Sequence, residues 1–189
     1  ESGELSRQTG LGGISYRAIQ KIWASADVEI ARSDKVYFRT SLHDYERYRA
    51  RVRWQVTTNF SASWNFAYTA NKTPNANTLP AGLGPYSFRS IDDSISLLWT
   101  PKGGDRFRFN GEYARQNWLS RVQYLGLPFA TPELSRYRED AHAGSAIADF
   151  VPLKGKSHAP RFSAGGSFYR SSGSRPTQFF QPVVRTAFS

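Results

Sequence analysis

The stretch RYRARVRWQVTTNFSASWNFAYT (Arg47–Thr69) decides the expected fold, because its residue type changes at every position. Every second residue from Arg47 to Arg53 is an arginine, and apolar or aromatic residues ending in Trp54 occupy the positions between them. Successive side chains of a β-strand point to opposite faces of the sheet. The pattern therefore predicts a strand with an arginine face and an apolar face. It argues against a basic patch in which arginines and aromatic residues share one ligand.

The same two-residue period extends over most of the chain, whereas helical periodicity is poor. It holds without a change of phase over residues 36–56, a run far longer than the roughly five or six residues of an average strand. In total the pattern predicts eight strands in up-and-down order within one domain, residues 1–189, of which 1–13 are irregular. The expected fold class is all-β: an antiparallel up-and-down transmembrane β-barrel that closes alone or forms part of a larger barrel.

Short and long connections alternate along the chain. Short turns are predicted at residues 57–59, 101–105 and 152–159, and long loops rich in Pro, Gly and Asn at 71–86 and 125–138. In an up-and-down sheet this places the short turns at one rim and the long loops at the other. Such an arrangement is typical of outer-membrane barrels.

The apolar-face residues nearest the short turns and the C-terminus are aromatic. They are Trp54, Phe60, Trp99, Phe107, Phe150, Phe162 and Phe188. Membrane barrels place such an aromatic girdle at the boundary between lipid and water. Aromatic pairs also flank hairpins in soluble sheets, but the repetition at three hairpins and at the terminus favours a girdle. Tyr48, Tyr68, Tyr113 and Phe168 are expected to form a second girdle at the other end of the strands.

On these segments, together with DSISLLWTPKGGDRFRFNGEYARQNW (Asp93–Trp118), the chain resembles bacterial outer-membrane β-barrel proteins of the porin type. The resemblance is one of pattern and covers most of residues 14–188. It implies location in the bacterial outer membrane, contact with the lipid bilayer and a role as a pore or scaffold. The family includes the barrels of porin–cytochrome conduits, so it also implies partner subunits or a protein that fills the lumen, such as a multihaem cytochrome.

Composition limits the class of partner. The net charge is +10 and the pI about 10.1, which favours anionic partners. Nucleic acid is disfavoured, because stacking on bases would need aromatic residues on the arginine face. The chain has no cysteine, which excludes disulfides, cysteine-ligated zinc and covalently attached haem. It has no run of roughly 18 apolar residues, which excludes a transmembrane helix.

If the aromatic face meets lipid, the arginine face lines the lumen. The residues expected there are Arg47, Arg49, Arg51, Arg53, Asp92, Arg106, Arg108, Glu112 and Arg161. In one interpretation they line a wet pore that favours small anionic solutes. In the other, the arginines pair with Asp92, Glu112 and Asp149 and fill a narrow barrel, as the interior of an eight-stranded barrel allows. Small residues on the same face favour a larger barrel and the first interpretation.

The sequence predicts no enzymatic activity, no metal site and no cofactor. Its three histidines are scattered, without metal-ligand spacing. Asp92 and Asp93 are neighbours in a strand, so they point to opposite faces and do not form a carboxylate pair. One alternative function stays open beside the pore and the sheath around a partner: a soluble all-β module that binds polyanions through its basic face.

Overall fold

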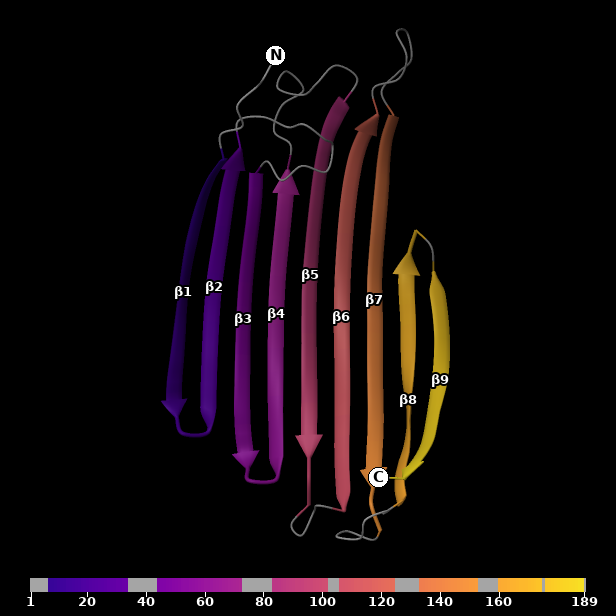
Figure 1. Cartoon of the computed structure of the whole chain (residues 1–189). Coiled ribbons are helices and arrows are strands. Elements are labelled where there is room, and N and C mark those ends of the chain that lie inside the picture. Colours follow the sequence, from indigo (N-terminus) through magenta and orange to yellow (C-terminus); the bar gives the residue numbers. More distant parts are fainter. Residues whose placement is uncertain are drawn as a thin grey trace.

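The computed structural model describes residues 7–33, 44–72, 83–101, 106–124, 133–152, 160–174 and 176–188. These residues form nine strands (Figure 1). They are β1 (Arg7–Ile19), β2 (Ile22–Ser33), β3 (Asp44–Thr57), β4 (Phe60–Lys72), β5 (Leu83–Trp99), β6 (Phe107–Tyr124), β7 (Glu133–Phe150), β8 (Pro160–Gly173) and β9 (Thr177–Phe188). The expected all-β class is confirmed, and so is the up-and-down order.

All nine strands belong to one sheet, in which each strand pairs antiparallel with the strand that follows it in the chain. Among the described strands, β1 pairs only with β2 and β9 only with β8, so hydrogen bonds do not close the sheet. Pro182 lies in β9, opposite Gly166. Proline lacks the donor that a second neighbour would need, and a strand with one neighbour tolerates it.

The number of strands exceeds the expected eight, because residues 7–13 were expected to be irregular and instead begin β1. Two features of the sequence conceal this strand. Glycines at positions 10, 12 and 13 lower its strand propensity. The turn to β2 is Gln20-Lys21, which lacks the glycine, proline or asparagine that normally marks a turn.

The long loops are shorter than expected. β5 begins at Leu83 and β7 at Glu133, although residues 71–86 and 125–138 were expected to be loops. Pairing across the sheet extends both strands, since Glu133 lies opposite Tyr124 and Leu83 opposite the same residue from the other side. Residues 36–43 of the long alternating run lie outside the described part of the chain.

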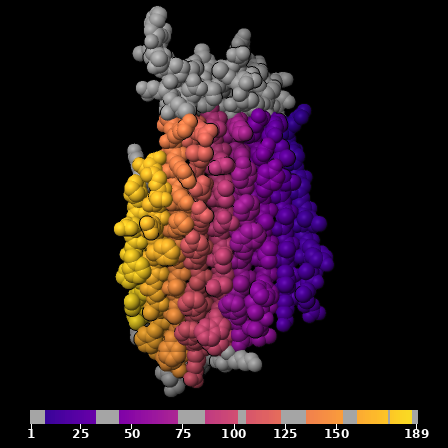
Figure 2. Space-filling view, turned by 180° about the vertical axis from the view of Figure 1, so that it is seen from behind, coloured from indigo at the N-terminus to yellow at the C-terminus, as the bar shows by residue number. Residues whose placement is uncertain are grey.

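The sheet is a single layer without a hydrophobic core. The only buried hydrophobic residues in the described part of the chain are Ala31, Tyr45, Ala70 and Ala141. The chain exposes 13397 Å², whereas a compact globular protein of its mass exposes about 9,100 Å². In Figure 2 the colours of neighbouring strands follow one another without interruption, so no other described element covers this side of the sheet.

One glycine lies where two strand backbones approach closely. Gly165 in β8 is opposite Ile147 in β7, and a Cβ at this position would lie 2.8 Å from the Ile147 Cα and closer still to the carbonyl oxygen of Ala146. Backbone cannot move aside as a side-chain end can. The absence of a side chain at 165 therefore permits this approach of β7 and β8.

Gly165→Ala is expected to lower the free energy of unfolding by about 1–3 kcal/mol, the usual cost of overpacking. The midpoint of urea unfolding, followed by tryptophan fluorescence, measures this change. Gly12→Ala is the matched control, because a Cβ there would meet only Val28 Cγ1 at 3.7 Å. Equal midpoints for the two variants would contradict the assignment of Gly165 to a close backbone approach.

Candidate functional site

The strand register defines two faces of the sheet. We call the face that carries Arg47, Arg49, Arg51 and Arg53 the polar face, and the face that carries Trp54 the apolar face. Residues directly opposite each other in an antiparallel pair lie on the same face. The register can therefore be followed from strand to strand to assign the remaining paired side chains to one of the two faces.

The polar face collects eight of the nine residues that the sequence assigned to the lumen. The register places eight of them on it: Arg47, Arg49, Arg51, Arg53, Asp92, Arg108, Glu112 and Arg161. Arg106 precedes β6, outside the paired strands, so the register assigns it to neither face. Whether this face encloses a lumen stays a prediction, since the sheet is open. Asp93 lies on the apolar face, opposite Phe66 and Arg115, so the expected separation of Asp92 and Asp93 is confirmed.

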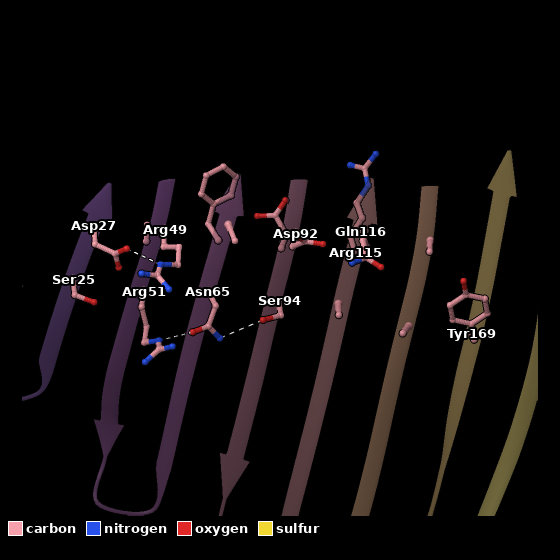
Figure 3. Close-up of a pocket in the computed structure, with 17 residues that line it drawn as sticks. Ser25, Asp27, Arg49, Arg51, Asn65, Asp92, Ser94, Arg115, Gln116 and Tyr169 are labelled. Atoms are coloured by element: carbon pink, nitrogen blue, oxygen red, sulfur yellow. Dashed lines mark hydrogen bonds and ion pairs between the residues drawn. The ribbon is translucent and has the colours of Figure 1, made fainter. Parts of the chain in front are cut away.

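The four arginines of β3 differ in their partners. Arg49 donates from Nε to Asp27 Oδ2 over 2.6 Å, and Arg47 Nη1 lies 3.9 Å from Glu29 Oε2. Arg51 donates to the neutral Asn65 Oδ1 over 2.9 Å, as Figure 3 shows. The side chain of Arg53 makes no hydrogen bond or ion pair with another described residue.

Asn65 in turn donates from Nδ2 to Ser94 Oγ over 3.2 Å, so the hydrogen bonds connect β3, β4 and β5 (Figure 3). We call the four arginines of β3 the ladder, and Arg51 and Arg53, which lie nearer the turn to β4, its lower half. In this lower half, Arg51 contacts a neutral side chain and Arg53 has no described side-chain partner. Its positive charge is not compensated by a carboxylate in the described residues. The upper half is compensated from β2.

The sequence predicted other partners. It named Asp92, Glu112 and Asp149, of which only Asp149 forms an ion pair with an arginine in the described structure. Arg161 donates to its Oδ2 over 2.9 Å, and Ser163 donates to its Oδ1 over 2.6 Å. Asp27 and Glu29 were missed. Their signal is the alternation of β2, which puts them on the polar face, and an antiparallel pairing that sets them opposite Arg49 and Arg47.

The polar face is hollowed. A cavity of about 550 Å³ is lined from β2 to β8 by residues that include Asp27, Arg49, Arg51, Asp92 and Tyr169. A second cavity of about 660 Å³ adjoins Arg53 and Arg108. A cavity whose walls come from seven consecutive strands requires the sheet to curl toward the polar face. Such a space can hold water or a small polar solute.

Charge on this face is mixed with a positive excess. The described arginines that the register places on it are Arg17, Arg47, Arg49, Arg51, Arg53, Arg108, Arg161 and Arg185. The described carboxylates on it are Asp27, Glu29, Asp92, Glu112, Glu139 and Asp149. Asp92 Oδ2 accepts from Ser90 Oγ over 2.5 Å, while its Oδ1 is buried and has no described partner. The cavity is therefore lined by arginine donors and by Asp92, one of whose carboxylate oxygens is buried.

The apolar face exposes most of the large hydrophobic side chains. Those more than a third exposed on it are Ile14, Tyr16, Ile19, Ile30, Tyr48, Trp54, Trp64, Ile95, Leu97, Trp99, Tyr113, Phe150, Phe162, Phe168, Phe180 and Val184. Monomeric soluble proteins rarely show an apolar patch larger than a few hundred Å². A patch that spans β1 to β9 requires another phase or another molecule against it.

The residues predicted to form a girdle are on this face at the short-turn end. Phe60 lies opposite Trp99, and Phe150 lies between Phe107 and Phe162. Trp54 lies opposite Ala62, which is the next residue after Phe60 on this face of β4 and lies further from the β3–β4 turn. The backbone of Phe188 lies opposite Pro160, but its side chain is outside the described residues. The assumed apolar phase of β7, with Phe150 on this face, is confirmed.

The upper edge of the apolar residues shifts along the strands from β2 to β8. On β2 the last apolar residue before a charged one is Ile30, and on β8 it is Phe168. The two positions can be compared on β7 by following opposite residues across the sheet, which together form a cross-strand row. Ile30 belongs to the row of Arg138, and Phe168 to the row of Gly144. These two residues of β7 are six positions apart (144 − 138).

The lower edge shifts in the same direction. On β2 the first apolar residue of this face is Ile22. Followed across the sheet from one opposite residue to the next, it leads to Gly166 on β8. The first aromatic residue of β8 on this face, Phe162, lies four residues from Gly166 (166 − 162). At about 3.3 Å per residue and 4.8 Å between strands, four to six residues over six strand spacings correspond to a tilt of roughly 25–35°. The apolar residues thus form a band of nearly constant height that crosses the strands obliquely.

A metal-binding constellation is absent from the described residues. They contain no group of three or more His, Asp or Glu residues that could hold a metal ion. His142 lies on the apolar face, where its Nδ1 is 2.6 Å from the Tyr113 hydroxyl. His43 and His158 are outside the described part of the chain. The described residues also contain no helix long and apolar enough to cross a membrane.

Comparison with known proteins adds no assignment: no protein-family model, no curated protein and no solved structure matches this chain.

Proposed function

We propose that the chain forms the wall of a porin-like barrel in the bacterial outer membrane, with an arginine-lined lumen that favours small anionic solutes. One observation carries the proposal: a single-layer sheet with an apolar face that no other described element covers and an arginine-rich, hollowed opposite face. Lipid supplies the phase that the apolar face requires. Each large side chain removed from water gains about 1.5–3 kcal/mol.

The oblique band supports a bilayer rather than a protein partner. Apolar bands of membrane barrels are about 25 Å tall and their strands tilt by roughly 35–45°. On β2 the band runs from Ile22 to Ile30, and on β8 from Phe162 to Phe168, which is about 20–26 Å along the strand and, at the tilt of roughly 25–35°, about 16–24 Å in height. A flat slab of lipid sets both edges at constant height, so both edges must step together across tilted strands.

Anion preference follows from the incomplete pairing of the ladder. Arg49 is compensated by Asp27, but Arg51 and Arg53 have no carboxylate partner among the described residues. Rings of unpaired charge select ions of the opposite sign in pores. The two free sheet edges favour a barrel with more strands than these, and a larger barrel leaves room for water inside.

Detergent dependence is the first test. We expect the purified chain to stay in solution only with detergent or lipid, and to migrate differently on a gel when it is not heated. Monodisperse protein in plain buffer would support the soluble polyanion-binding module and reject the membrane proposal. Reversal potentials across a planar bilayer in a salt gradient then test the lumen: anion preference is expected, and cation preference would reject the arginine-lined pore.

Asp27→Asn is expected to increase anion preference. The asparagine oxygen still accepts the hydrogen bond from Arg49, which the carboxylate now accepts over 2.6 Å, but the compensating charge is gone. A unit charge about 6 Å from a permeating ion in water is worth about 0.7 kcal/mol, or roughly threefold in relative permeability. The shift in reversal potential measures this, with Asp93→Asn on the opposite face as a control that should leave it unchanged.

A further inference from the structure

The apolar face carries a set of arginines just beyond the apolar band, with far fewer carboxylates beside them. On β6, β7 and β8 the described arginines of this face are Arg115, Arg121, Arg136, Arg138 and Arg170, and Asp140 is the only described carboxylate among them. Arg121 and Arg136 lie directly opposite each other. Like charges opposite each other destabilise a sheet, so folding alone does not account for this arrangement.

Asp140 is already engaged. Arg115 donates to it from Nε over 3.0 Å and from Nη2 over 2.9 Å, and His142 Nε2 lies 3.6 Å from the same carboxylate. Arg170, opposite His142, makes no hydrogen bond or ion pair with another residue that the structure describes. Arg170 therefore presents an uncompensated charge next to a neutralised pair.

A groove of about 570 Å³ lies beside this charge. Its lining has an aromatic part, Tyr113 and Phe168, and a polar part, His142, Asp140, Arg170 and Ser172. Phe168 is the last apolar residue of β8 on this face, and Arg170 is the next residue on the same face. The groove thus crosses the upper edge of the apolar band.

A glycine shapes the aromatic wall. Gly144 lies opposite Phe168, and a Cβ there would come within 2.8 Å of the ring carbon Cζ. The ring occupies the space that a side chain at 144 would take and so lies against the sheet. The groove floor is therefore apolar and open to an extended hydrocarbon chain.

We propose that this groove binds a membrane lipid with a phosphate in its head group, with the phosphate at Arg170 and an acyl chain along Phe168. The inference rests on the membrane function proposed above and deepens it. An aromatic wall below and a cation above match the junction between acyl chains and phosphate. An arginine that keeps all its donors free can bind phosphate with two parallel hydrogen bonds.

Lipid retention tests the assignment. The full chain is refolded in mixed micelles that contain equal amounts of phosphatidylglycerol and phosphatidylcholine, and the lipids bound after purification are counted by native mass spectrometry. We expect preferential retention of phosphatidylglycerol, reduced roughly tenfold in Arg170→Gln through loss of a charge-assisted hydrogen bond. Arg53→Gln, the same change on the polar face, should retain lipid as the unchanged protein does.

Further outcomes separate the alternatives. Phe168→Ala should lose phosphatidylglycerol although Arg170 is intact, whereas displacement of the lipid by inorganic phosphate alone would overturn the assignment to a lipid. A chain that conducts ions in bilayers but retains both lipids equally would overturn this inference and leave the proposed function standing. A chain that is soluble without detergent would overturn both.

Discussion

Leu97→Arg is expected to impair insertion into lipid vesicles, whereas Leu98→Arg is expected to leave it almost unchanged. The two leucines are consecutive in β5 but lie on opposite faces: Leu97 opposite Gly111 on the apolar face, and Leu98 opposite Asn110 on the polar face. An arginine facing lipid near the bilayer midplane costs about 2–4 kcal/mol, and less near the interface. Leu97 is one pair from Trp99 at the band edge, so we expect about 2 kcal/mol, or roughly thirtyfold in the folding equilibrium.

The measurement is the urea dependence of folding into vesicles, followed by tryptophan fluorescence. Ile95→Arg should cost more than Leu97→Arg, because residue 95 lies one pair further from the band edge. The same side chain at 98 joins Arg108 and Asn110 beside a hollow lined by polar groups. Equal losses at 97 and 98 would mean that both faces meet the same environment, and would refute the assignment of the apolar face to lipid.

Replacement of both Arg51 and Arg53 by glutamate is expected to turn anion preference into cation preference. These two arginines are the part of the ladder without a described carboxylate partner, so their reversal changes the local charge by four units. At about 0.7 kcal/mol per charge near 6 Å in water, even a strongly screened effect exceeds several-fold in relative permeability.

Reversal potentials in a salt gradient measure the change, and high salt should diminish it. Replacement of both Arg89 and Arg121 by glutamate is the matched control: it makes the same change of four charge units at exposed positions of the apolar face. A reversal by the control as large as that by the double variant would show that selectivity arises from overall charge. An unchanged preference in the double variant would remove the arginines of β3 from the conduction path.

The faces of the sheet were predictable because alternation is a local property. From residue 44 to residue 72 the phase of the arginines and of the aromatics in β3 and β4 agrees with the register found. The apolar phase of β7 was assigned from little more than Phe150 and two alanines, and the pairing of Phe150 with Phe162 confirms it. Wherever residue size or polarity alternates strongly, one strand contains enough information to assign its own faces.

Partners of individual side chains were harder to predict, because they depend on register between strands. Asp27 lies opposite Arg49 only in one register of β2 against β3, and the sequence between these strands does not indicate that register. The strand β1 was missed for a related reason, since its turn at Gln20-Lys21 is made by residues common in strands and helices. The groove at Arg170 needs three strands in register, which no local pattern specifies.

The direction of the two edge strands has a consequence for assembly. Because consecutive strands are antiparallel and their number is odd, β1 and β9 point the same way, as their arrowheads in Figure 1 show. Joining them to each other would create a parallel seam. A second copy inserted with the same sidedness would meet the first through parallel seams as well. A cylinder that is antiparallel all round therefore needs an odd number of additional strands between β9 and β1, and nine plus one makes ten the smallest such assembly.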